Sequence, residues 1–210
     1  VATMKVTMNL AADIPVLGTV GRLAPEKQLM YLLEALKILK DRGFHFLCLI
    51  IGDGPERISM EARIAAMGLS EKVRMLGQRE DVNDLLEIMD VFLFSSGGEG
   101  FSIAILEAMA KGKPVVAFDV EGINEAVVSG ETGFLAPAGD TEKLADYAQR
   151  LLQNPDLARR TGLQAYHRVR TLFDIRRNVQ SLESLYQALL EKNIQKLSTA
   201  NIFQEYAKFS

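Results

Sequence analysis

The feature that most constrains the fold is a continuous apolar run that ends in a glycine turn. Residues 46–51 are all apolar and lead directly into Gly52-Asp53-Gly54-Pro55. An unbroken apolar run is typical of a strand in a sheet covered on both faces, because a half-exposed strand would alternate apolar and polar side chains. A helical pattern follows the turn as far as Met67. The stretch therefore predicts a buried strand followed by a helix.

The same unit of strand, turn and helix recurs along the chain. We predict strands at residues 16–20, 46–51, 73–76, 91–94, 114–118 and 133–136, with helices between them. Strands that alternate with helices in this way predict a parallel, doubly wound α/β sheet of six strands, Rossmann-like in type. After Asn154-Pro155 the pattern is only helical, at about 156–171 and 175–191.

The chain is expected to divide into three parts. Residues 1–15 are a lead-in or interdomain segment, which allows a short edge strand or a connection equally well; residues 16–192 form the Rossmann-like domain; residues 193–210 form a C-terminal helical tail. The first residue is Val rather than Met, so we expect a piece of a longer protein.

Composition excludes several classes of function. The net charge of −3 gives no electrostatic reason to expect nucleic acid as a partner, and association with a membrane has no support either. No apolar run approaches the length of a membrane span. The single cysteine, Cys48, cannot form an intrachain disulfide, so a reducing cytoplasm is the simplest location. The chain has two histidines and no Cys/His cluster, which disfavours a transition-metal site.

The strongest candidate for a binding site is residues 95–112, SSGGEGFSIAILEAMAKG. Its glycines allow a ligand to approach the backbone closely, and the helix that begins near Ser102 offers free N–H groups and a partial positive charge to an anion. Glu99 and Glu107 could hold hydroxyl groups. Because this helix is apolar on every side except at Glu107, we expect it to be buried.

Two cations lie at the exit of the first strand. Arg22 and Lys27 would stand beside a helix N-terminus, an arrangement that suits a diphosphate better than a monocarboxylate. Ligands of open parallel sheets bind at the carboxyl ends of the strands, where these residues fall. Neither a G-x-G-x-x-G fingerprint nor a Walker A sequence is present, so NAD chemistry and ATP hydrolysis are disfavoured.

Four motifs occur in a fixed order: Gly21-Arg22-Leu23-x-x-Glu26-Lys27, Gly52-Asp53-Gly54-Pro55, Glu99-Gly100-Phe101-x5-Glu107-Ala108 and Pro137-x-Gly139-Asp140. On these motifs, residues 16–190 resemble the C-terminal domain of the group 1 glycosyltransferases, the retaining family 4 enzymes of GT-B architecture. The chain would then be one half of a GT-B fold. Gln28 stands where many relatives carry Gly, and no chemical consequence is expected from it.

The resemblance implies a role for each matching residue. Arg22 and Lys27 would grip the diphosphate of a nucleotide-sugar and stabilise the departing nucleoside diphosphate, while Glu99 would contact the donor sugar and Glu107 the ribose. The other donor-binding positions are Gly21 at the first strand exit, Gly77 and Arg79 near the base, and the backbone of Gly100, Phe101 and Ser102 at the distal phosphate. Fixed positive charge would stabilise the leaving group, so neither a metal nor a cofactor is expected.

The resemblance does not extend to the N-terminal Rossmann-like domain, which supplies the acceptor site in such enzymes. We therefore expect the chain to bind a nucleoside diphosphate weakly and to transfer no sugar alone. Two alternatives stay open: a nucleotide-sugar epimerase of the same architecture, and a non-catalytic phospholigand-binding module. The base is not specified by the sequence, and UDP is the default only because it is the commonest donor in such enzymes. Asp53 and Asp140 are expected to serve a turn and a helix cap.

Overall fold

The computed structural model describes residues 4, 5, 8, 11, 13–98 and 100–206, with side chains described as far as Glu191. Most of the predicted lead-in and Glu99 therefore lie outside the described residues. Met4 and Lys5 are helical. The chain forms two compact units, residues 1–170 and 171–210. The predicted division into a domain of residues 16–192 and a tail of residues 193–210 stays a prediction.

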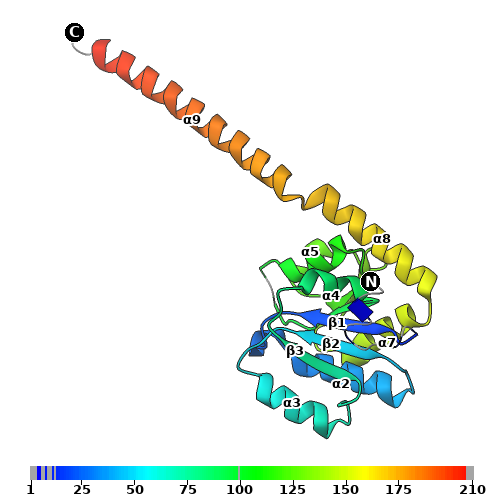
Figure 1. The fold of residues 1–210 in the computed structure, drawn as a ribbon. Coiled ribbons are helices and arrows are strands. Elements are labelled where there is room, and N and C mark those ends of the chain that lie inside the picture. Colours follow the sequence, from blue (N-terminus) through cyan, green and yellow to red (C-terminus); the bar gives the residue numbers. More distant parts are fainter. Residues whose placement is uncertain (1–3, 6–7, 9–10, 12, 99, 207–210) are drawn as a thin grey trace. The chain divides into compact units, whose positions relative to one another are not determined.

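The first unit is built on a six-stranded parallel sheet with the order β3-β2-β1-β4-β5-β6 (Figure 1). Its strands are β1 (Val16–Val20), β2 (Leu47–Ile51), β3 (Val73–Gly77), β4 (Val91–Phe94), β5 (Val115–Phe118) and β6 (Gly133–Ala136). The strands match the predicted apolar runs closely. This arrangement confirms the predicted doubly wound α/β fold, and all five residues of β2 are buried as expected for a covered sheet.

Helices follow the strands in regular alternation: η1 (Pro25–Lys27), α2 (Leu29–Asp41), α3 (Arg57–Ala66), α4 (Val82–Ile88), α5 (Ile103–Ala110), α6 (Ile123–Ala126) and α7 (Thr141–Leu152). Helix α2 packs against α3 and α7, whereas α5 packs against α4 and α6 (Figure 1). The helix α8 (Pro155–Leu172) follows, and α9 (Ile175–Tyr206) makes up most of the second unit. Asp140 accepts a hydrogen bond from the Lys143 N–H at 2.8 Å, so it caps α7 as predicted.

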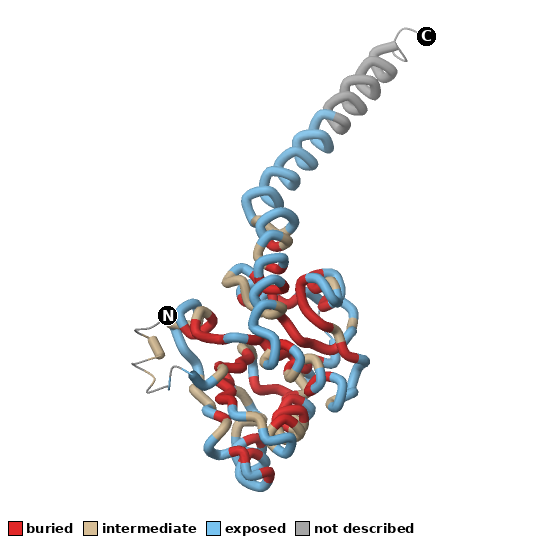
Figure 2. The backbone as a smooth tube through the Cα atoms, turned by 90° about the vertical axis from the view of Figure 1, so that its right-hand side faces the viewer, coloured by how far each residue is buried: buried red, intermediate tan, exposed pale blue. Residues whose placement is uncertain are grey.

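The core lies between the sheet and its helices (Figure 2). The side chains of Leu17, Ile50 and Leu93 are almost fully buried, together with the leucines on the inner face of α2. Burial raises the pKa of the Cys48 thiol to about 12, because the thiolate would lose its solvation there. Cys48 therefore acts as a small apolar core residue.

The second unit contains no buried side chain among those described. Residues 175–191 of α9 are all exposed, including the apolar side chains of Val179, Leu182 and Leu189. None of the helices in the described part of the chain combines the length and the apolar character that crossing a membrane requires.

Candidate functional site

The order of the strands reverses between β1 and β4, which are direct neighbours in the sheet. From β1 the chain proceeds outward through β2 and β3, and from β4 it proceeds in the other direction. Such a switch leaves a crevice at the carboxyl ends of the two strands. We call this side the carboxyl edge. Two segments begin at this crevice. We call residues 21–28, which follow β1, the cation turn, and residues 95–102, which follow β4, the glycine loop.

Hydrogen bonds join the cation turn to the glycine loop. The Ser95 hydroxyl donates to the Lys27 carbonyl at 3.0 Å, and the Ser96 hydroxyl donates to the Glu26 carbonyl at 3.1 Å. The Gly97 N–H also donates to the Glu26 carbonyl, at 3.1 Å. Because both serines are buried, these bonds are shielded from water. Two segments about seventy residues apart thus form one continuous surface.

The two predicted cations lie on this surface. Arg22 is exposed and makes no hydrogen bond or ion pair with any residue that the structure describes, and Lys27 Nζ lies 5.7 Å from the centroid of the Phe94 ring. The cavity between the two loops has a volume of about 10 Å³, room for roughly one water. A larger ligand would therefore lie on the open surface above it.

The turn after β2 holds the cation turn in place from the other side. The Gly21 N–H donates to the Ile51 carbonyl at 3.0 Å, and the Leu23 N–H donates to the Asp53 carbonyl at 3.0 Å. Gly52 has a φ of +131°, and a Cβ on it would collide with the Gly21 carbonyl oxygen. Only glycine fits there. Asp53 accepts a hydrogen bond from the Gly54 N–H at 2.7 Å, so it serves the turn as predicted.

Helix α5 differs from the sequence prediction. The expectation of burial on every side was wrong: Ile103 is 68% exposed, and Glu107 is also exposed. The helix buries only the face that carries Ile105, Ala108 and Met109. Since Ile103 and Glu107 are four residues apart, they share the opposite face. The Glu107 carboxylate is therefore solvated and open to a ligand.

The predicted phosphate-binding backbone lies where the glycine loop enters α5. Gly100 and Phe101 are exposed, and Ser102 is buried at the N-cap position of the helix. The Ser102 side chain makes no capping hydrogen bond. The first N–H groups of α5 are thus not capped by this side chain. Glu99, the fourth predicted group of this loop, lies outside the described residues.

The predicted base-binding region, at the exit of β3, lies farther along the carboxyl edge. Gly77 has a φ of +67°. Arg79 is held by Asp81 through two hydrogen bonds, Nε to Oδ1 at 2.8 Å and Nη2 to Oδ2 at 2.6 Å. This pairing raises the pKa of Arg79 and lowers that of Asp81. Because β3 stands two strands from β1, about 10 Å away, a ligand that reaches both regions must be extended.

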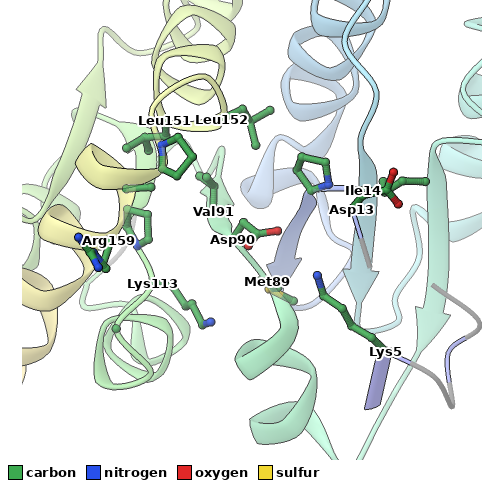
Figure 3. Close-up of a pocket in the computed structure, with 15 residues that line it drawn as sticks. Lys5, Asp13, Ile14, Met89, Asp90, Val91, Lys113, Leu151, Leu152 and Arg159 are labelled. Carbon is green, nitrogen blue, oxygen red and sulfur yellow. The ribbon is translucent and has the colours of Figure 1, made fainter. Parts of the chain in front are cut away.

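A separate cavity of about 340 Å³ lies at the opposite side of the sheet, the amino edge, where β1 and β4 begin (Figure 3). Asp90 accepts a hydrogen bond from the Val16 N–H at 2.7 Å, and Lys113 Nζ donates to the Glu87 carbonyl at 2.7 Å. These two charged groups therefore bond to backbone. None of the predicted site residues lines this cavity. Within the described residues, no group of three or more His, Cys, Asp or Glu side chains could hold a metal ion.

Sequence reasoning missed three residues of the site. Ser95 and Ser96 supply the bonds between the loops, and Gln28 adopts the left-handed backbone conformation, with φ 49° and ψ 38°. The signal for Gln28 was present, because a position at which relatives carry Gly is a candidate for positive φ. No feature of the sequence indicates that Ser95 and Ser96 bond to the cation turn.

The chain matches the family model described as "Glycosyl transferases group 1" over residues 4–168. It is 36% identical to the alpha-D-kanosaminyltransferase of Streptomyces kanamyceticus over 155 residues, which cover 73% of this chain and 40% of that enzyme. It is 37% identical to the phosphatidyl-myo-inositol mannosyltransferase of Mycobacterium leprae over 150 residues, which cover 69% of this chain and 39% of that enzyme.

Solved structures show the same fold. The sucrose-phosphate synthase of Thermosynechococcus elongatus superposes with a TM-score of 0.82 at 30% identity, covering 90% of this chain and 49% of that one. Anabaena HepE, solved in complex with UDP and glucose, superposes with a TM-score of 0.80 at 28% identity, covering 88% of this chain and 51% of that one. The chain thus spans about half the length of these proteins or less.

Proposed function

Because the chain belongs to the group 1 glycosyltransferases, we propose that it is the donor-binding half of a retaining enzyme that moves a sugar from a nucleoside diphosphate-sugar to an acceptor. The observation that carries this proposal is the hydrogen-bonded surface formed by the cation turn and the glycine loop. It combines two cations with a helix N-terminus at the switch point of the sheet.

The proposed chemistry needs positive charge where the diphosphate departs. When the bond between the anomeric carbon and the phosphate oxygen breaks, the oxygen keeps the electron pair and the diphosphate gains negative charge. Arg22, Lys27 and the first N–H groups of α5 would stabilise that charge, and their fixed positions mean that little reorganisation is needed during the reaction. The acceptor oxygen would then form the new bond to the same carbon, and the proton that its hydroxyl loses would pass to the departing diphosphate.

The extended carboxyl edge favours a nucleotide as the rest of the donor. Glu107 lies exposed on α5, where its carboxylate could accept hydrogen bonds from ribose hydroxyls, and the β3 exit would receive the base. Anabaena HepE was solved with UDP. This supports UDP as the first nucleotide to test. The transferase names of the relatives favour sugar transfer over the epimerase alternative.

The acceptor would be bound by a domain that is not in this chain. The matched relatives are more than twice as long as the segment that they share with it. We therefore expect the 210-residue chain to bind the nucleoside diphosphate but to transfer no sugar alone.

Calorimetric titration of the 210-residue chain with UDP, GDP and ADP tests the proposal. We expect binding of at least one nucleotide, with an affinity that falls about 10- to 100-fold in Lys27→Ala, because a charge-assisted hydrogen bond is lost. Arg160→Ala is the control, since it removes one positive charge from an exposed side chain of α8, whereas Lys27 is half-buried. Absence of binding by all three nucleotides, or equal losses in both variants, would contradict the proposal.

A further inference from the structure

Gln28 is held in a backbone conformation that side-chain-bearing residues rarely adopt. Among the described residues it is the only one other than glycine with a positive φ. The conformation is fixed on both sides: the Gln28 N–H donates to the Pro25 carbonyl at 3.0 Å, and the Tyr31 N–H donates to the Gln28 carbonyl at 3.0 Å. Gln28 thus ends η1 and precedes α2, directly after the proposed phosphate-binding Lys27.

The side chain of Gln28 lies against the glycine loop. A Cβ built on Gly97 would stand 2.5 Å from Gln28 Cδ and would also overlap the amide nitrogen. The carboxamide therefore occupies the space that any side chain at position 97 would need. Glycine at 97 and glutamine at 28 are matched to each other, although they lie far apart in the sequence.

The glycines of the loop are open to solvent. Gly97, Gly98 and Gly100 are exposed, and no atom beyond the chain neighbours lies within 4 Å of a Cβ built on Gly98 or Gly100. Glycines lose the most backbone freedom on ordering. Contacts at the start of the loop help to order Gly97 and Gly98: the Ser96 hydroxyl lies within hydrogen-bond distance of the Glu26 and Gly98 carbonyls, the Gly97 N–H donates to the Glu26 carbonyl, and the Gln28 carboxamide lies against Gly97.

We propose that Gln28 is a positioning residue of the donor site. Its left-handed backbone directs the carboxamide onto Gly97, and this contact holds the glycine loop in the conformation that presents the N-terminus of α5 to the diphosphate. The role rests on the proposed function. It also gives a reason why glutamine occupies a position where its backbone is strained: the side chain offsets the cost of the conformation by ordering the loop.

The Gln28→Gly variant separates this role from a merely structural one. Glycine removes the backbone strain, so the melting temperature should rise. It also removes the carboxamide, so the affinity for UDP should fall by about fivefold, the equivalent of ordering roughly one backbone residue on binding. Exchange of the Gly97 and Gly98 amide hydrogens, measured without ligand, should become faster although the chain as a whole is more stable. A residue with only a structural role would change stability and affinity in the same direction.

A double-mutant cycle with Gly97→Ala supplies the closing test. Alanine at 97 displaces the carboxamide, so it should weaken UDP binding in the wild-type chain but have no further effect in the Gln28→Gly chain. If the wild-type chain binds UDP while Gln28→Gly binds equally well, or if the two substitutions are additive, the role of Gln28 is wrong. If the wild-type chain binds no nucleotide, the proposed function fails and the role of Gln28 fails with it.

Discussion

The two edges of the sheet carry similar kinds of side chain but use them differently. At the amino edge, Asp90 and Lys113 lie beside a cavity of about 340 Å³, yet both bond to backbone atoms of neighbouring segments. At the carboxyl edge the cavity between the cation turn and the glycine loop is only about 10 Å³, but Arg22 and Glu107 are exposed. The larger cavity does not by itself mark a site for an ionic ligand, because Asp90 and Lys113 in its lining are already bonded to backbone.

The largest expected effect concerns the backbone that supports the carboxyl edge. Gly52→Ala should lower the free energy of unfolding by about 3 kcal/mol or more, because the Cβ meets the Gly21 carbonyl and φ is positive there. Urea denaturation measures this loss. Gly98→Ala is the control: it meets no atom within 4 Å, and its effect should stay within about 0.5 kcal/mol. Similar losses in both variants would show that the turn after β2 does not support the cation turn.

A smaller effect is expected at the exposed carboxylate of α5. Glu107→Gln should weaken UDP binding by about 10- to 30-fold, since a neutral amide accepts hydrogen bonds from hydroxyls less strongly than a carboxylate. The melting temperature should stay unchanged because Glu107 is exposed. Calorimetry and thermal unfolding of the same samples give both quantities. A variant that becomes clearly more stable would mean that the carboxylate is buried and unsatisfied after all.

The smallest effect is expected at the amino edge. Lys113→Met should lower the free energy of unfolding by about 1 kcal/mol through loss of the hydrogen bond to the Glu87 carbonyl. It should leave UDP affinity unchanged. A loss of affinity comparable to that of Lys27→Ala would show that the amino edge also takes part in binding UDP.

The stability difference between the wild-type chain and Lys113→Met should also depend on pH. Burial lowers the pKa of Lys113, because desolvation disfavours its charged form. The unfolded chain therefore binds the proton more tightly, and the stability of the wild-type chain relative to Lys113→Met should rise as the pH increases from the lowered pKa towards the ordinary value of 10.5. Denaturation at several alkaline pH values measures the slope, and a falling difference would contradict burial of the ammonium group.

The strands could be predicted because each is an apolar run that ends at a turn. In a sheet covered on both faces, burial alone decides which residues can form a strand, as in β2. The strand order and its switch point come from the structure, but residues that directly follow the strands of a parallel sheet lie at its carboxyl edge whatever that order is. The positions of Arg22 and Lys27 at the carboxyl edge could thus be read from residue numbers.

The remaining features depend on contacts between distant segments. The composition of α5 could not show which face packs on the sheet, so the helix was wrongly expected to be buried on every side. The contact between Gln28 and Gly97 joins two loops that are adjacent only because β1 pairs with β4. The bidentate pair of Arg79 and Asp81 depends on the local path of the chain after β3, which no apolar pattern records.

The most direct test of the carboxyl edge is to map UDP binding by NMR on the isotopically labelled 210-residue chain. Amide shifts should change at residues 21–28 and 95–103 and stay unchanged at 89–91 and 112–114, which line the cavity of the amino edge or adjoin it. Changes concentrated at the amino edge, with residues 21–28 and 95–103 unaffected, would contradict the assignment of the donor site to the carboxyl edge.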